Sequence, residues 1–232
     1  MSLKPPKKGD LSKSWMRPRK CKKIITSPEY HLIVSEGTKT EPHYFEGLQR
    51  EIYKKCGRNR IHIRIEGEGR NTLSLLERAQ EYVRSSNNPI RHVWLVYDLD
   101  DFPHDDFDNT AHKCTELTSA SQSRNSEEAV AYHALWSNQC IELWFLLHFE
   151  YLQADKHRSG YWQMLSAYLN KIAQGDYKKN REDIYEILRP YLDTAKKNAK
   201  KLVKDNTSNP PSKSAPGTNV YEIFDALSAY LA

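Results

Sequence analysis

The sequence lacks the features that mark membrane, secreted and disulfide-stabilised proteins. It contains no run of about 18 apolar residues, so no membrane-spanning helix is expected. Its basic N-terminus is not followed by the apolar segment of a secretory signal. Its four cysteines include no C-x-x-C pair and no histidine at zinc-ligand spacing, which argues against a zinc site or a disulfide framework. Internal repeats are also absent. We therefore expect a cytoplasmic protein without membrane contact, whose oligomeric state the sequence leaves open.

The positive charge is unevenly distributed along the 232 residues, whose formal net charge is +5. Residues 1–25 show no apolar periodicity and contain three prolines, so they are predicted to form a flexible arm. This arm can bind phosphates, or it can serve only as a solubilising tail. Its basic residues include Lys4, Lys7, Lys8, Arg17, Arg19, Lys20, Lys22 and Lys23, against a single Asp10.

Strand and helix patterns alternate in the next part of the chain, residues 26–150, which we interpret as the core domain. Alternation of this kind predicts an α/β fold, in which right-handed crossovers build a parallel β-sheet with helices on both faces. The expected strands are 30–35, 61–66, 91–98 and 129–136, and the expected helices are 41–55, 71–85, 106–120 and 138–150.

Strand signals stop after residue 150, so residues 151–232 are predicted to be a helical C-terminal region. Asn138 and Thr218 are the expected N-caps of the helices that follow them, and Pro190 is expected to interrupt a helix. The predicted helices are 161–173, 181–204 and 220–231, with a loop at 206–217.

Acidic residues follow two of the predicted strands directly. Glu36 comes after the strand 30–35, Asp98 is the last residue of the strand 91–98, and Asp100 follows two positions later. Parallel strands bring their carboxyl ends to one edge of a sheet, so these carboxylates are expected to meet there. Carboxylates at such short distances repel one another unless a hard cation such as Mg²⁺ lies between them. The alternative for the D-x-D pattern is a solvated loop whose aspartates cap the next helix.

The turn after Glu36 has features of a phosphate site. Gly37 allows close approach of the backbone, and the following helix N-terminus offers amide donors to an anion. Lys39 can hold a phosphate or can be an exposed lysine without a role. Glu41 can bind metal or can be a first-turn acid favoured by the helix dipole.

Glu142 is an acid within an otherwise apolar segment, residues 141–149. A carboxylate in such surroundings is costly without a partner, and the start of this helix is expected at the same edge of the sheet as the other acids. The alternative is a glutamate at the solvent rim. His148 is a weaker candidate for catalysis, since a structural histidine at a helix end explains it equally.

A lysine run near the end of the chain has the i, i+4 spacing of one helix face. It can form a basic ridge for a nucleic-acid backbone, or a solvated face. The residues are Lys196, Lys197, Lys200, Lys201 and Lys204.

The order of these elements and acids resembles the Toprim domain of topoisomerases, primases and a class of nucleases, over residues 30–150. Two local strings, VSEGTKTE at 34–41 and SNQCIELWFLLHF at 137–149, are similar to the RloB family. With Asn198-Ala199 and Asn209-Pro210, this resemblance spans nearly the whole chain after the arm. The family more often has proline at the position of Gln139. This departure affects the start of the following helix, and Gln139 is not an expected metal ligand.

The resemblance implies a Toprim-like, Rossmann-like fold and a nuclease that depends on Mg²⁺ or Mn²⁺. It also implies a role in antiviral defence with an AAA- or ABC-type ATPase partner. In the Toprim pattern, Glu36 is then a general acid/base or a metal ligand, and Asp98 and Asp100 are metal ligands. The family string and the burial argument together suggest Glu142 as a further metal ligand. RNA and DNA both stay open as substrates.

Two other functions fit parts of the pattern. A catalytically silent Toprim scaffold could bind an ATPase or nucleic acid. A phosphatase of the D-x-D type would also place Asp98 and Asp100 after a strand, but it would leave Glu36 unexplained, and Asp101 stands where such enzymes carry Thr or Val.

Overall fold

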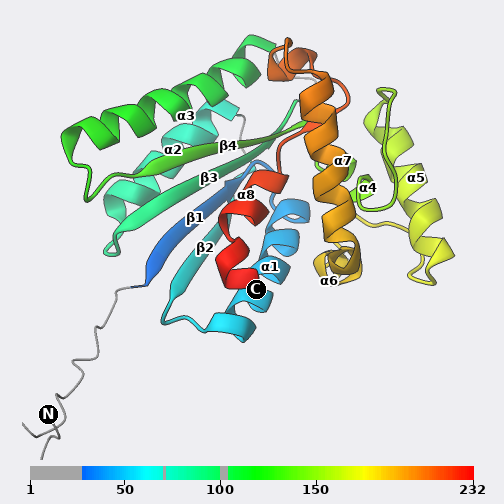
Figure 1. Ribbon diagram of the computed structural model, residues 1–232, viewed down its shortest axis with the longest axis horizontal. Helices are drawn as coiled ribbons and strands as arrows, with labels where there is room; N and C mark the ends of the chain where they lie inside the picture. Colours follow the sequence, from blue (N-terminus) through cyan, green and yellow to red (C-terminus); the bar gives the residue numbers. More distant parts are fainter. Residues whose placement is uncertain (1–27, 70–71, 100–103) are drawn as a thin grey trace, which may run out of the picture.

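A five-stranded sheet forms the centre of the computed structural model, which describes residues 28–69, 72–99 and 104–232 (Figure 1). The strand order is β2-β1-β3-β4-β5. Strands β1 to β4 are parallel, and β5 runs antiparallel to β4. The predicted α/β class with a parallel sheet is therefore confirmed for β1 to β4, whereas the antiparallel strand β5 was not expected. The strands are β1 Glu29–Ser35, β2 Ile61–Gly67, β3 Ile90–Asp98, β4 Ala131–Asn138 and β5 Gly217–Thr218.

Helices cover both faces of the sheet, as in Rossmann-like folds. Helices α2 and α3 lie on one face, and α1 with the C-terminal helices lies on the other (Figure 1). The helices are α1 Thr40–Cys56, α2 Thr72–Ser85, α3 His104–Arg124, α4 Glu142–Leu146, α5 Arg158–Lys171, α6 Ile184–Leu188, α7 Leu192–Asp205, α8 Tyr221–Ala226 and α9 Ser228–Leu231.

The alternation of side chains along β1, β3 and β4 supplies both apolar cores, whereas the apolar side chains of β2 enter only the cluster on the α1 side. In β1, Leu32 and Val34 pack in the cluster on the α2 and α3 side, whereas Ile33 packs on the α1 side. Because both faces of the central strands are covered, β1 and β3 contain uninterrupted apolar runs, from Leu32 to Val34 and from Val93 to Tyr97. The register pairs Ser35 with Val96 in β3, so β1 and β3 end at the same edge of the sheet.

The C-terminal region belongs to the same apolar cluster as the sheet and α1. Leu165 of α5, Leu188 of α6 and Phe224 of α8 are fully or almost fully buried in that cluster. The prediction of helices at the end of the chain is correct, and Pro190 lies in a 3₁₀ turn, Arg189–Tyr191, that separates α6 from α7.

Four expectations about residues 138–232 need correction. Thr218 belongs to strand β5, and Val220 is the N-cap of α8. Asn138 ends β4 and donates from its side-chain amide to the carbonyls of Pro211 and Ser212 instead of capping a helix. The helix expected at 138–150 is only the five residues of α4. The loop expected at 206–217 contains a 3₁₀ turn, Pro211–Lys213.

None of the helices in residues 28–69, 72–99 and 104–232 combines the length and apolar content needed to cross a bilayer.

Candidate functional site

Glu36 and Asp98 lie together at the carboxyl edge of the sheet. Glu36 directly follows β1, and Asp98 is the last residue of β3, the neighbouring parallel strand. Oε2 of Glu36 accepts a hydrogen bond from the backbone N–H of Asp98 at 3.4 Å. The expectation that these acids converge is therefore met in the structure, whereas their chemical roles stay predictions. Asp100 lies outside the described residues.

Asp98 is held between the sheet and the start of α4. Its Oδ2 accepts from the backbone N–H of Ile141 at 3.1 Å, and the carboxylate is almost completely buried. The strand also continues beyond it, since the N–H of Leu99 donates to the carbonyl of Ser137 in β4. These backbone contacts fix the Asp98 carboxylate at the edge where β1, β3 and β4 end.

A cleft of about 300 Å³ opens beside these two acids. It is formed mainly by the turn between β1 and α1, which brings a third carboxylate, Glu41, to the same space. Its lining residues are Glu36, Gly37, Thr38, Lys39, Thr40, Glu41, Asp98 and Lys179. Three carboxylates and two lysines therefore share one small opening.

Gly37 permits this arrangement. A Cβ atom built at Gly37 would lie 2.1 Å from Oε2 of Glu41, so the glutamate side chain occupies the space that any other residue would fill. Gly67, at the end of β2, is similarly restricted, because a Cβ there would lie 2.7 Å from the carbonyl oxygen of Gly37. The two glycines let the turn fold tightly against the sheet.

Glu41 is buried and its charge is unfavourable in this structure. Burial raises the pKa of Glu41 to about 7, and the negative charge of nearby Glu142 acts in the same direction. The positive charge of Lys179 opposes this rise in the pKa. A cation bound in the cleft would therefore favour the ionised form of Glu41.

Glu142 lies behind the cleft, next to Glu41. It is 2% exposed, in the first turn of α4, and Oε1 accepts a hydrogen bond from the hydroxyl of Tyr177 at 2.9 Å. Glu142 is not among the residues that line the cleft. The structure thus places Glu142 near enough to Glu41 for their charges to interact, but outside the lining of the cleft.

Lys179 and Tyr177 were not anticipated from the sequence. They lie between α5 and α6, and the carbonyl of Lys179 accepts from Oγ1 of Thr40 at 2.8 Å. The ammonium group of Lys179 lies 4.5 Å from the ring centre of Trp162. No local pattern signals either residue, since both reach the site through contacts between distant parts of the chain.

The lysine ridge on α7 is partly neutralised. Nζ of Lys196 and of Lys200 each lie 2.7 Å from a carboxylate oxygen of Asp225 in α8. Nζ of Lys201 lies 4.0 Å from the ring centre of Tyr151. Lys197 and Lys204 are exposed, and neither forms an ion pair with another residue in the described ranges.

His148 is a buried structural residue in this arrangement. Its Nδ1 lies 3.0 Å from the carbonyl oxygen of Trp144, one turn earlier. Burial lowers the pKa of His148 to about 4, so the imidazole is neutral near pH 7. It does not line the cleft.

Comparison with known proteins identifies the family. Neither the curated proteins nor the solved structures contain a match to the chain. The family model described as RloB-like protein matches residues 31–227, a range that includes every described acid of the site. The chain therefore belongs to the RloB-like protein family.

Proposed function

We propose that this protein is a nuclease that hydrolyses phosphodiester bonds of nucleic acid with the help of Mg²⁺ or Mn²⁺. The observation that carries the proposal is the convergence of Glu36, Asp98 and Glu41 on one cleft beside Lys179. Carboxylates at the ends of parallel strands, with cationic side chains in the same opening, suit a phosphate ester and a divalent cation together.

The donors in the cleft fit such an ion. All three acids offer carboxylate oxygens, the hard ligands that Mg²⁺ prefers, and Mg²⁺ is usually held by one or two carboxylates together with waters and substrate phosphates. The raised pKa of Glu41 supports this fit, because a buried carboxylate between other acids gains most from a cation. We propose Glu36, Asp98 and Glu41 as the residues that hold the ion, and Asp100 as a further ligand.

The bound ion would polarise the scissile phosphate as a Lewis acid. Glu36 would accept the proton of the attacking water, since it lines the cleft. Lys179 and Lys39 would pair with the phosphate oxygens. Glu142 would act on Glu41 from behind, because its negative charge favours the protonated form of Glu41 until a cation is present. Tyr177 would keep Glu142 in place.

Family likeness suggests the biological setting. We propose that the protein is a cytoplasmic effector of antiviral defence that works with an ATPase partner. The competing proposal is a catalytically silent subunit that uses the same fold to bind such a partner or nucleic acid.

One experiment separates these functions. The purified full-length chain is incubated with Mg²⁺ or Mn²⁺ and with tRNA, single strands and duplexes, both alone and with an ATPase encoded beside its gene. We expect cleavage that EDTA abolishes and that Asp98→Asn lowers by at least about 100-fold. Glu46→Gln is the matched control, because Glu46 is exposed on α1 and does not line the cleft.

The nuclease proposal fails if no substrate is cut under any of these conditions. The silent subunit is supported instead if Asp98→Asn retains full protective activity in cells.

A further inference from the structure

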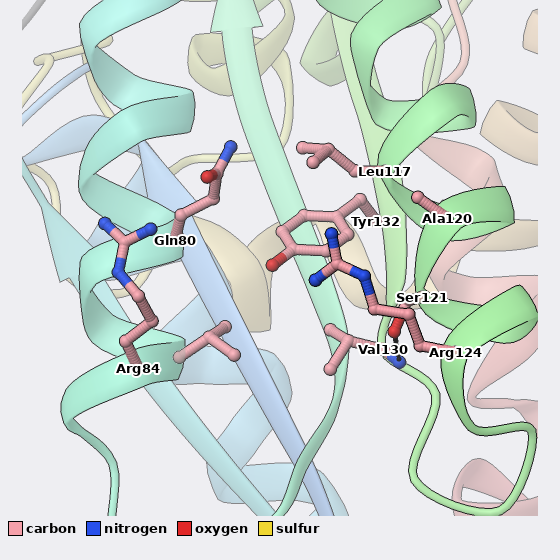
Figure 2. A pocket seen from close by; sticks show the side chains of 9 residues that line it. Gln80, Arg84, Leu117, Ala120, Ser121, Arg124, Val130 and Tyr132 are labelled. Atoms are coloured by element: carbon pink, nitrogen blue, oxygen red, sulfur yellow. Dashed lines mark hydrogen bonds between the residues drawn. The ribbon is translucent and has the colours of Figure 1, made fainter.

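A second hollow lies at the opposite end of the sheet from the acidic cleft. It is a groove of about 410 Å³ between the C-terminal parts of α2 and α3, beside the start of β4 (Figure 2). We call it the arginine groove, and it is lined by Gln80, Val83, Arg84, Leu117, Ala120, Ser121, Arg124, Val130 and Tyr132.

Two arginines border this groove from opposite helices. Arg84 projects from α2 and Arg124 from α3, with Tyr132 between the two helices (Figure 2). Both arginines are exposed, and neither forms an ion pair with a carboxylate in the described part of the chain. Arginines on this protein are commonly paired, as Arg50 is with Glu186 at 2.8 Å. The groove therefore carries two positive charges that the described structure does not neutralise.

The polar and apolar parts of the groove are separated. Val83, Leu117 and Val130 are partly buried against the apolar cluster on this face of the sheet, and they form an apolar floor. Tyr132 adds an aromatic ring to that floor. Its hydroxyl makes no hydrogen bond with any residue that the structure describes. Burial raises the pKa of Tyr132, and the positive charge of Arg84 opposes this rise. The guanidinium of Arg84 is therefore near enough to the hydroxyl of Tyr132 for the two groups to interact.

The floor is held in a fixed conformation by α3. The backbone N–H of Val130 donates to Oγ of Ser121 at 2.8 Å, and the N–H of Tyr132 donates to Oγ1 of Thr118 at 2.8 Å. These bonds tie the entrance of β4 to the helix on one side of the groove. The groove is thus a preformed feature, which reduces the ordering that a ligand must impose.

The groove continues into a neighbouring hollow of about 400 Å³, which shares Val83 and Val130 with it. This extension adds a third arginine, Arg91, and the side-chain amides of Asn87 and Asn88, together with one acid, Glu128. The two hollows together carry three arginines and one acid, and this excess of positive charge suits a chain of phosphates.

We propose that the arginine groove and its extension bind single-stranded nucleic acid. Phosphates lie against Arg84, Arg124 and Arg91, and an unpaired base lies on the apolar floor, where the hydroxyl of Tyr132 and the amide of Gln80 meet its edge. Unpaired bases expose the planar faces that apolar and aromatic side chains cover, whereas a duplex keeps them stacked inside. The inference rests on the proposed function only in taking nucleic acid as the substrate, and it names that substrate as single-stranded.

Binding can be measured without cleavage. A fluorescently labelled unpaired oligonucleotide, as RNA and as DNA, is titrated with the full-length chain in EDTA. We expect Arg84→Ala/Arg124→Ala to weaken binding by about tenfold or more at about 0.1 M salt, and to reduce the slope of log affinity against log salt by about 1.4. Tyr132→Phe should weaken binding by about twofold to fivefold, since the ring stays and only the hydroxyl is lost.

The matched control is Lys54→Ala/Lys171→Ala. Both lysines are exposed, on α1 and α5, and neither lines the groove or its extension. The control removes the same two charges from the molecule, so it should retain the affinity of the unchanged protein. A uniform loss in both double variants would indicate a nonspecific charge effect and would overturn the proposal.

Three other results would overturn the proposal. Unchanged binding in Arg84→Ala/Arg124→Ala would show that the oligonucleotide binds elsewhere on the protein. Equal affinity for adenosine monophosphate and the oligonucleotide would indicate a free nucleotide. Tighter binding of a duplex than of its separate strands would exclude the unpaired base.

The outcome is independent of the acidic cleft. If the arginine variant cleaves and binds nucleic acid normally, the nuclease proposal stands and the groove proposal is overturned. If nucleic acid binds through the groove but no substrate is cleaved, the groove proposal stands and the nuclease proposal is overturned. If both proposals hold, the arginine variant should raise KM for single strands with little change in kcat.

Discussion

The hydroxyl of Tyr177 donates a hydrogen bond to Oε1 of Glu142 at 2.9 Å, which joins the segment after α5 to the first turn of α4. The carboxylate is 2% exposed and lies beside Glu41, which is also buried. A buried carboxylate is costly unless a hydrogen-bond donor satisfies it. The hydroxyl of Tyr177 therefore stabilises the buried Glu142 carboxylate next to the cleft.

Tyr177→Phe should destabilise the protein by about 1–3 kcal/mol, since the buried Glu142 carboxylate loses a donor while the ring is retained. Urea unfolding at neutral pH measures this loss. The same variant should lower the rate of metal-dependent cleavage. An unchanged unfolding midpoint would show that Glu142 does not need this donor.

Gly37→Ala should impair the cleft more than the fold. The new Cβ would lie 2.1 Å from Oε2 of Glu41, so the end of this side chain must move away. Displacement of a reacting group by about 1 Å can lower a rate by about 100-fold, and we expect a loss of about 10- to 100-fold in nuclease activity.

Gly160→Ala is the control for this substitution. Gly160 lies in α5, where a Cβ would come no closer than 3.7 Å to Lys156, so the change should preserve activity and stabilise the helix by about 0.5–1 kcal/mol. Full activity in Gly37→Ala would exclude Glu41 from the working site.

His148 should make the fold sensitive to acid. Burial lowers the pKa of this imidazole from 6.5 to about 4, so the unfolded chain binds its proton first as the pH falls. Its contribution to stability is complete above about pH 6.5 and is lost between pH 6.5 and 4, up to about 3 kcal/mol. His133 acts in the same direction, because burial lowers its pKa to about 4. Glu41 acts in the opposite direction, since its pKa is raised.

The comparison that isolates His148 is between His148→Gln and the unchanged protein. The free energy of unfolding of the variant should fall less between pH 6.5 and 4, by up to about 3 kcal/mol. His112→Gln is the control, since the His112 side chain is 73% exposed and should have little effect. Parallel pH curves for His148→Gln and the unchanged protein would contradict the assignment.

Asn219 should be important for stability although it does not line the cleft. Its Oδ1 accepts from the N–H of Trp136 at 2.7 Å, and its Nδ2 donates to the carbonyl of Ala134 at 2.8 Å. Asn219→Ala leaves both backbone groups of β4 without these partners, and we expect a loss of about 2–5 kcal/mol. Asn219→Asp keeps the acceptor and loses the donor, so its free energy of unfolding should lie between those of the unchanged protein and Asn219→Ala. Equal loss in the two variants would indicate that the amide donor alone matters.

The fold could be predicted because its main strands are buried on both faces. Val93 to Tyr97 and Leu32 to Val34 are apolar without interruption, and helices separate them along the chain. Glu36 and Asp98 could be brought together by the same reasoning, since adjacent parallel strands end at one edge.

The remaining features depend on contacts between distant residues. Strand β5 has only two residues, too few to show alternation, and Asn138 bonds to Pro211 and Ser212 across the fold. Lys179 reaches the cleft through Thr40, 139 positions earlier in the chain. A single sequence carries no local signal for such contacts. Glu142 could be placed near the other acids, but its absence from the lining of the cleft could not be foreseen.

Strand β5 and Asn219 also determine how two copies of this protein could meet. Together they occupy hydrogen-bonding groups along the outer side of β4 from Ala134 to Asn138, so that border is closed to strand addition by another molecule. The opposite border of the sheet is β2, where Arg64 and Glu66 form an ion pair at 2.8 Å. Charged side chains on a border strand discourage edge-to-edge aggregation. The sheet is therefore protected at one border by its own chain and at the other by charge.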